Sequence, residues 1–244
     1  MATETSESGK RVDLGSVNDD CDPRLLKSHY FPSKVGGKPA WLSLNPIPPT
    51  DRLTCSKCSG QLVFLMQVYC PRDQQPDAFH RTLFLFVCRN PACCSPNDAA
   101  NFTVFRSQLP RVNQFFSADP PPDDPSEYVG VTPSAGKYQS LCVVCGCVGT
   151  KQCSQCHSAN YCGKEHQSRH WKAGHKKTCG KQGSQESGDY KVQQVLHTHT
   201  HTYLNTLMYL WWSLYILYLW ACQVKVTVGD SGFCCCTCVM SFKF

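Results

Sequence analysis

The sequence predicts an α+β protein with a small β-rich N-terminal domain that carries a zinc-ribbon-like pair of knuckles. A finger with two zinc ions and a short helix is expected next, followed by a disordered or unstable C-terminal tail. Three observations lead to this prediction. The chain has 19 cysteines among its 244 residues, its start lacks the apolar stretch of a secretory signal, and its first half contains apolar runs of strand length. Cysteines this dense in a reducing compartment usually bind metal, so zinc is the expected cofactor.

The N-terminal part divides into a leader and a β domain. Residues 1–23 are polar and without periodicity, and we expect them to be a disordered leader. Residues 24–116 have a globular composition. The expected strands of this domain lie at 61–69, 81–87 and 101–109, where branched and aromatic residues form solid runs or alternate with polar ones. This mixture predicts a sheet that is buried on at least one face.

Two pairs of cysteines flank the first two expected strands. Cys55 and Cys58 precede the first strand, and Cys88 and Cys93 follow the second. Two loops at one end of a sheet, each with two thiolates, form the arrangement of a zinc ribbon. The second spacing is wider and Cys94 adjoins it, so the fourth ligand stays open. Reduced structural thiols are the alternative to a third zinc ion.

A second compact unit is expected at 137–181, after a linker rich in proline and aspartate at 117–136. Its cysteines and histidines form four pairs, and each pair has the spacing that places two ligands on one ion. The pairs are Cys142 with Cys145, Cys153 with Cys156, Cys162 with His166, and His175 with Cys179. Eight such ligands would close two tetrahedral zinc sites and leave no open position for catalysis. A unit this small cannot fold on its apolar core alone, so these sites are expected to be structural.

Other residues of this unit fall outside the paired pattern. For Cys147, His157 and His170 we expect packing or solvation. The unit has eight Lys and Arg residues and Glu165 as its one acid. With two zinc ions and six thiolates included, about +5 remains, which favours an acidic or anionic partner. A solvated basic face without a specific partner is the alternative.

The string from Cys142 to Cys179, which closes with HKKTC, resembles a MYND-type zinc finger. The resemblance implies that the ligand pairs interleave. One zinc ion would be held by Cys142, Cys145, Cys162 and His166, and the other by Cys153, Cys156, His175 and Cys179. Most such fingers have cysteine in the place of His166, but imidazole is an equally competent zinc ligand.

Several segments outside the finger resemble the programmed cell death protein 2 family, which joins such a β domain to a MYND finger in this order. They are SKVGGKPAWL (33–42), the C-x2-C before LVFLMQVY, FHRTLFLFVCRNPAC (79–93) and VFRSQLPR (104–111). The resemblance covers residues 24–181. It implies a cytoplasmic and nuclear chaperone for a small-subunit ribosomal protein in 40S ribosome biogenesis. It also implies that the Gly36-Gly37 turn and the PAWL segment belong to the sheet that holds the client.

The alternative among binding proteins is a MYND adaptor that docks proline-containing peptides of transcriptional regulators. An enzyme is not indicated, because the sequence has no Gly-rich phosphate loop and no H-E-x-x-H motif. Nucleic-acid binding is not favoured, because the basic residues of the finger are scarcely interleaved with aromatic ones.

Residues 182–244 form a low-complexity and hydrophobic tail. The family continues past the finger into an acidic stretch and a second half of the β domain, which this tail does not resemble. We therefore interpret residues beyond 190 as an alternative or unspliced end of a truncated isoform. The uncharged stretch 203–222 has the length that spans a bilayer. We expect an aggregation-prone tail; membrane insertion, through this stretch alone, and a buried helix are the alternatives.

Overall fold

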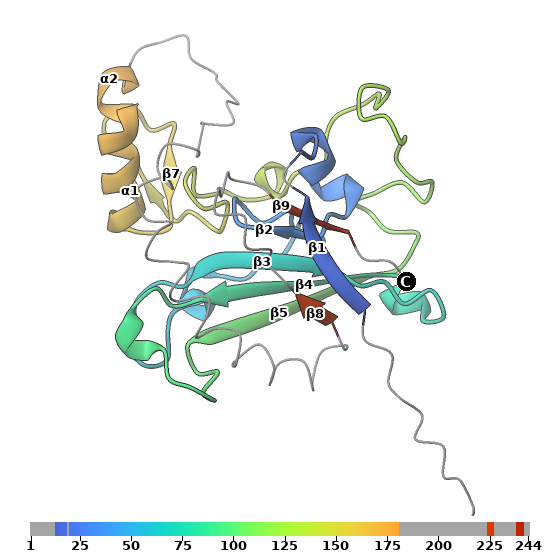
Figure 1. The fold of residues 1–244 in the computed structure, drawn as a ribbon. Helices are drawn as coiled ribbons and strands as arrows, with labels where there is room; N and C mark the ends of the chain where they lie inside the picture. The colour runs from blue at the N-terminus through green and yellow to red at the C-terminus, as the bar shows by residue number, and fades with distance from the viewer. Residues whose placement is uncertain (1–12, 19, 181–223, 227–237, 242–244) are drawn as a thin grey trace, which may run out of the picture.

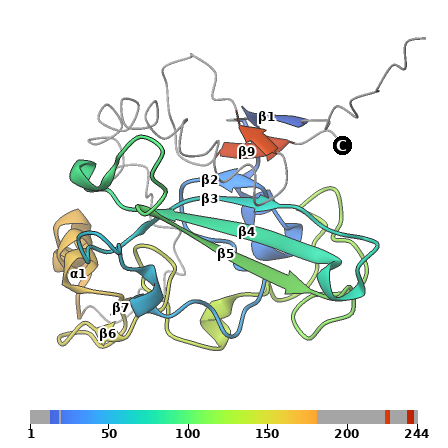
Figure 2. The same cartoon turned by 90° about the horizontal axis from the view of Figure 1, so that it is seen from below.

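The computed structural model describes residues 13–18, 20–180, 224–226 and 238–241. The main sheet has seven strands in the order β5-β4-β3-β2-β9-β1-β8, and a two-stranded sheet, β6-β7, belongs to the finger. In Figures 1 and 2 the finger lies beside one end of strands β3 to β5. The predicted α+β class, with a sheet in the N-terminal domain and a short helix in the finger, is confirmed.

The three predicted strands are present as an antiparallel meander. They are β3 (Val63–Tyr69), β4 (His80–Val87) and β5 (Phe102–Leu109). Aromatic side chains of β4 supply much of the core, since Phe84 and Phe86 are almost fully buried. Aromatic residues favour strands because they pack well on a pleated surface.

The remaining strands of the main sheet are short. They are β1 (Asp13–Asn18), β2 (Lys34–Val35), β8 (Val224–Val226) and β9 (Cys238–Ser241). β1 thus lies inside the segment expected as a leader, and β8 and β9 lie inside the segment expected as a tail. β2, β8 and β9 have too few residues to show a period, and β1 (DLGSVN) is mostly polar, so neither kind is found from sequence. β1 pairs with β8 and β9, across the two ends of the chain.

Short helical turns connect these elements. In the N-terminal domain they are η1 (Pro23–Leu26), η2 (Ser28–Tyr30), η3 (Thr50–Leu53), η4 (Pro76–Ala78) and η5 (Pro91–Cys93), and η6 (Ala135–Lys137) leads into the finger. The finger contains β6 (Lys151–Gln152), β7 (Asn160–Tyr161), α1 (Lys164–His170), the π-turn η7 (Trp171–His175) and α2 (Lys176–Thr178).

The segment after β2 turns inward and does not continue the sheet. Gly36 and Gly37 have φ of 73° and 70°, the left-handed region that favours glycine. The Ala40 N–H then donates to Oε1 of Gln67 on β3, at 2.8 Å. Trp41 and Leu42 are buried in the core. The expectation that PAWL forms part of the sheet is therefore wrong, because these side chains pack beneath it.

One apolar core serves both the N-terminal domain and the finger. Residues Trp41, Leu44 and Phe86 belong to the same cluster as Ala135 and Cys147. The predicted linker also contacts the domain, since the ring of Tyr128 lies 4.2 Å from that of His29. The finger therefore packs against the N-terminal domain through this shared core.

The part of the chain that the structure describes has no helix that is both long and apolar enough to traverse a bilayer. The uncharged stretch 203–222 lies outside the described residues. The start of the expected alternative end, at about residue 190, also lies outside the described residues.

Candidate metal centres

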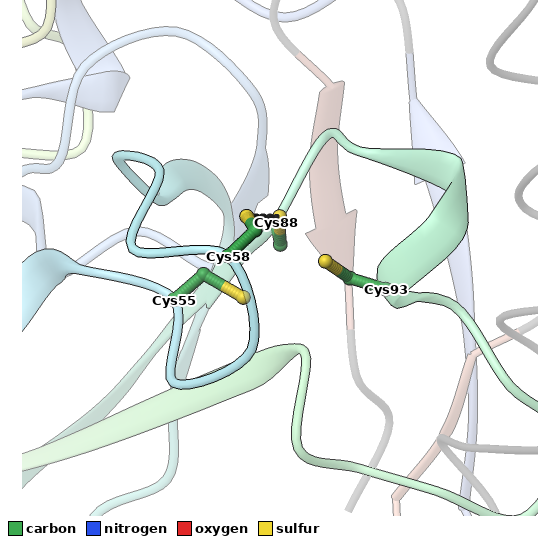
Figure 3. A group of neighbouring side chains, drawn as sticks. All are labelled: Cys55, Cys58, Cys88 and Cys93. Atoms are coloured by element: carbon green, nitrogen blue, oxygen red, sulfur yellow. Dashed lines mark hydrogen bonds between the residues drawn. The ribbon is translucent and has the colours of Figure 1, made fainter.

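Four cysteine sulfurs meet where β3 begins and β4 ends. Figure 3 shows Cys55 and Cys58 on one loop and Cys88 and Cys93 on the other. All four Sγ atoms lie within 4.8 Å of one another. The structure thus brings together the four residues that the zinc-ribbon pattern singled out. Cys94 lies outside the cluster, where its Sγ accepts a hydrogen bond from Nδ2 of Asn101.

A lysine joins the two loops of this cluster. Nζ of Lys57 donates to the Cys93 carbonyl at 3.1 Å and to the Asp98 carboxylate at 2.5 Å. Its positive charge offsets part of the negative charge that four thiolates would place on one zinc ion. A backbone hydrogen bond from Gly60 lowers the pKa of the Cys58 thiol to about 7. This favours the thiolate form that binds metal.

The first cluster of the finger spans three of its segments. It contains Cys142, Cys145, Cys162 and His166, whose ligand atoms all lie within 4.8 Å of one another. Nδ1 of His166, on α1, is 2.9 Å from Sγ of Cys162, which lies two residues before the helix begins. Hydrogen bonds from Cys145 and Cys162 lower the pKa of Cys142, which favours its thiolate.

The second cluster of the finger contains Cys153, Cys156, His175 and Cys179. Nε2 of His175 lies 3.5 Å from Sγ of both Cys153 and Cys156. Sγ of Cys179 is 3.8 Å from Sγ of Cys153. The two finger clusters therefore interleave along the chain in the order that the resemblance to MYND fingers implied.

The donor atoms of all three clusters fit zinc. Each offers four ligand atoms, and every ligand atom is a thiol sulfur or an imidazole nitrogen. Such donors suit tetrahedral zinc, whereas calcium and magnesium prefer oxygen. Because protein ligands fill all four positions, the geometry is that of structural sites without an open position for a substrate.

The residues predicted to lie outside the zinc pairs are placed as follows. Cys147 and His170 are buried and His157 is exposed. None of the three belongs to a cluster among the described residues.

Comparison with known proteins connects these clusters to a family. The model of the programmed cell death protein 2 N-terminal domain matches residues 11–123, and the MYND finger model matches residues 142–179. The two matches give an N-terminal domain of the programmed cell death protein 2 type followed by a MYND finger, in the order that the resemblance implied. The finger match begins at the first and ends at the last ligand of the two interleaved clusters.

Several curated relatives have the same name. The chain is 48% identical over 178 residues to programmed cell death protein 2 of Bos taurus, which is 71% of this chain and 49% of the relative. It is 48% identical over 171 residues to the Mus musculus protein, or 69% and 48% of the two chains. A Homo sapiens programmed cell death protein 2-like protein is 41% identical over 80 residues, or 33% and 21%. The chain thus spans about half the length of the programmed cell death protein 2 relatives. No solved structure shows significant similarity to it.

Proposed function

We propose that this chain is a non-enzymatic, zinc-dependent interaction protein that escorts a small-subunit ribosomal protein during 40S ribosome biogenesis, in the cytoplasm and the nucleus. The resemblance to a family of dedicated chaperones supports this role. In this proposal each of the three clusters ligates one zinc ion and stabilises the fold. The ions hold the binding surface in shape and take no part in chemistry.

An open apolar cavity carries the proposal. Its volume is about 280 Å³, and its lining includes Trp41, Ile47, Phe84 and Phe105, with prolines from residues 46–49. Apolar pockets with few polar groups are the usual places where side chains of a partner are buried. We propose that an extended, partly apolar segment of the client occupies this cavity.

The cavity adjoins an edge of the sheet. Phe105 and Ser107 line it from β5, which is the end strand in the order of the main sheet. An edge strand offers backbone N–H and C=O groups that can pair with an added strand. The position of the cavity therefore supports binding of an extended chain segment.

Charge does not separate the β domain from the finger as the surface for the client. Residues 24–116 carry eleven Lys and Arg against four Asp, and residues 137–181 carry eight against one Glu. Like charges facing each other across an interface disfavour binding. The proposal for the client therefore rests on the apolar cavity, whose lining includes Arg106 as its one charged side chain.

A second candidate function rests on the exposed indole of Trp171. This side chain is 37% exposed on the finger and is followed directly by Lys172. Aromatic surfaces dock proline-rich peptides, which are already extended and lose little entropy on binding. The alternative is therefore a MYND adaptor that binds proline-containing segments of transcriptional regulators.

Point substitutions in the full chain separate the two functions. Deleting residues 137–181 is not a suitable test. It would remove Cys147, and Leu141 and Val148 which pack beside it, from the shared core, and would therefore damage the N-terminal domain as well. Proteins captured from cells by tagged full-length chain would be quantified by mass spectrometry. The variants are Phe105→Ala in the cavity, Trp171→Ala on the finger, and Val112→Ala as a control that is 77% exposed.

If the chain is a chaperone, wild type, Trp171→Ala and Val112→Ala all enrich a small-subunit ribosomal protein. Phe105→Ala then captures several-fold less of that protein. Zinc content and melting temperature check that Phe105→Ala is folded. If that ribosomal protein is absent and proline-rich regulators are lost with Trp171→Ala, the chaperone function is wrong and the adaptor function replaces it.

A further inference from the structure

Two buried side chains lie between the finger clusters and belong to neither. Tyr161 is 0% exposed and packs with Cys142 of the first cluster and Cys153 of the second. His170 is also buried. Neither residue belongs to the four ligand pairs, and the sequence alone predicts only packing or solvation for His170.

These two side chains contact each other and the ligands of both clusters. Oη of Tyr161 and Nδ1 of His170 form a hydrogen bond of 2.8 Å. Tyr161 directly precedes the ligand Cys162, and His170 lies one turn after the ligand His166 on α1. Both residues are thus fixed to the first cluster through the backbone.

The same pair contacts a ligand of the second cluster. The ring of His170 stacks on the ring of His175, with centroids 4.6 Å apart and planes at 13°. Trp171 meets the His175 ring nearly edge-on, at 6.0 Å and 72°. The His175 ring is therefore confined while its Nε2 points at the thiols of Cys153 and Cys156.

Orientation of a ligating imidazole affects how tightly it binds metal. Partners outside the ligand shell set the ring orientation, and their loss typically costs about 10- to 100-fold in metal affinity. Here the partner of His175 is His170, whose own ring is held by Tyr161. A ring placed by helix α1 moves when α1 moves, so the geometry of the second cluster depends on that of the first.

We propose that Tyr161 and His170 are positioning residues that couple the two zinc sites of the finger. Zinc at Cys142, Cys145, Cys162 and His166 fixes α1, and α1 holds His170 against His175. By reciprocity, zinc at the second cluster favours binding at the first to the same extent. This inference rests on the proposed zinc ligands and is independent of the client.

Chelator titration of the full chain tests this coupling. The zinc-loaded protein would be labelled with ¹⁵N-histidine, and the imidazole signals of His166 and His175 followed separately as EDTA is added. In the wild type both signals change at the same EDTA concentration. In His170→Asn, which keeps an acceptor for Tyr161 but removes the stack, zinc at His175 is lost at about 10-fold lower EDTA than zinc at His166.

Two further variants complete the design. Tyr161→Phe removes the hydroxyl and keeps the ring, and it separates the two midpoints in the same direction by a smaller factor. His157→Asn makes the same chemical change at an exposed position of the finger, and its two midpoints stay together.

Three outcomes of this titration would overturn the proposed coupling. If His170→Asn shifts both midpoints by one factor, or shifts neither, His170 is a packing residue and the coupling is overturned. If the wild-type signals change at different EDTA concentrations, the sites are independent and the coupling is again overturned. If neither histidine of the wild type binds zinc, the proposed ligand sets fail and the coupling fails with them.

Discussion

Nε1 of Trp41, in the β domain, donates a hydrogen bond of 2.9 Å to the carbonyl oxygen of Gly146, in the first knuckle of the finger. Trp41 is 4% exposed. Gly146 has φ of 71°, and a Cβ added there would lie 3.0 Å from Cβ of Lys38. The knuckle that carries Cys142 and Cys145 is therefore seated on the β domain, and the two parts form one unit.

Trp41→Phe is expected to destabilise both parts together. The substitution keeps an aromatic ring but leaves the buried Gly146 carbonyl without its indole donor, which costs about 1–3 kcal/mol. Urea unfolding of the zinc-loaded chain measures this cost, with one transition for β domain and finger. Trp171→Phe, at the exposed indole, should change stability by less than about 0.5 kcal/mol. Equal effects of the two substitutions would contradict the proposed contact.

Cys93→Ser is expected to lower the zinc content from three ions per chain to two. Cys94→Ser should leave three, because Sγ of Cys94 lies outside the cluster of Cys55, Cys58, Cys88 and Cys93. Mass spectrometry of the metal content of purified protein counts the ions. Loss of zinc from Cys94→Ser, or three ions in Cys93→Ser, would show that the ligand set is wrong.

Gly146→Ala is expected to be more destabilising than Gly36→Ala. Both glycines have a positive φ, of 71° and 73°, so alanine pays a similar backbone penalty of about 1–2 kcal/mol at each. Only Gly146 is also close to Lys38, whereas a Cβ at Gly36 meets nothing within 4 Å. The difference between their free energies of unfolding isolates the close approach of finger and domain. No difference would mean that the knuckle has room to move.

His80 is expected to make stability depend on pH. Burial, followed by the charge of Arg111, lowers the pKa of His80 below its ordinary value of 6.5. Above pH 6.5 the ring is neutral in both folded and unfolded chains. As pH falls, the unfolded chain takes up the proton first, so the free energy of unfolding decreases until pH passes the folded pKa.

His80→Gln removes this titration. The advantage of wild type over His80→Gln should shrink between about pH 7 and pH 5, as measured by urea unfolding. Zinc loss in acid affects both proteins and cancels in the difference. A difference that stays constant with pH would contradict the buried neutral imidazole, which also bonds Tyr69.

Local sequence patterns predicted the strands and the ligand pairs, because both depend on residues that are close in sequence. The apolar runs produced β3, β4 and β5 where they were expected. The choice of Cys93 over Cys94 depends on a local turn that spacing does not reveal. There the Asn90 side chain accepts from the Ala92 N–H and caps η5, which ends at Cys93.

Contacts between distant segments could not be predicted in this way. Trp41 and Gly146 are 105 residues apart, and neither segment contains a pattern that predicts their contact. The stack of His170 on His175 depends on the π-turn and on Gly174, whose φ is 146°. Such features follow from packing of the whole chain, which leaves no periodic signal.

Hydrogen exchange of the Cys142→Ser variant tests most directly whether zinc, finger and β domain form one unit. Loss of this ligand should unfold the first knuckle and remove the acceptor of Trp41. The account predicts faster exchange at finger amides and also in the β domain, at Leu42, Leu44 and Phe86 of the shared core. Faster exchange confined to residues 137–180, with the β domain as protected as in wild type, would contradict it.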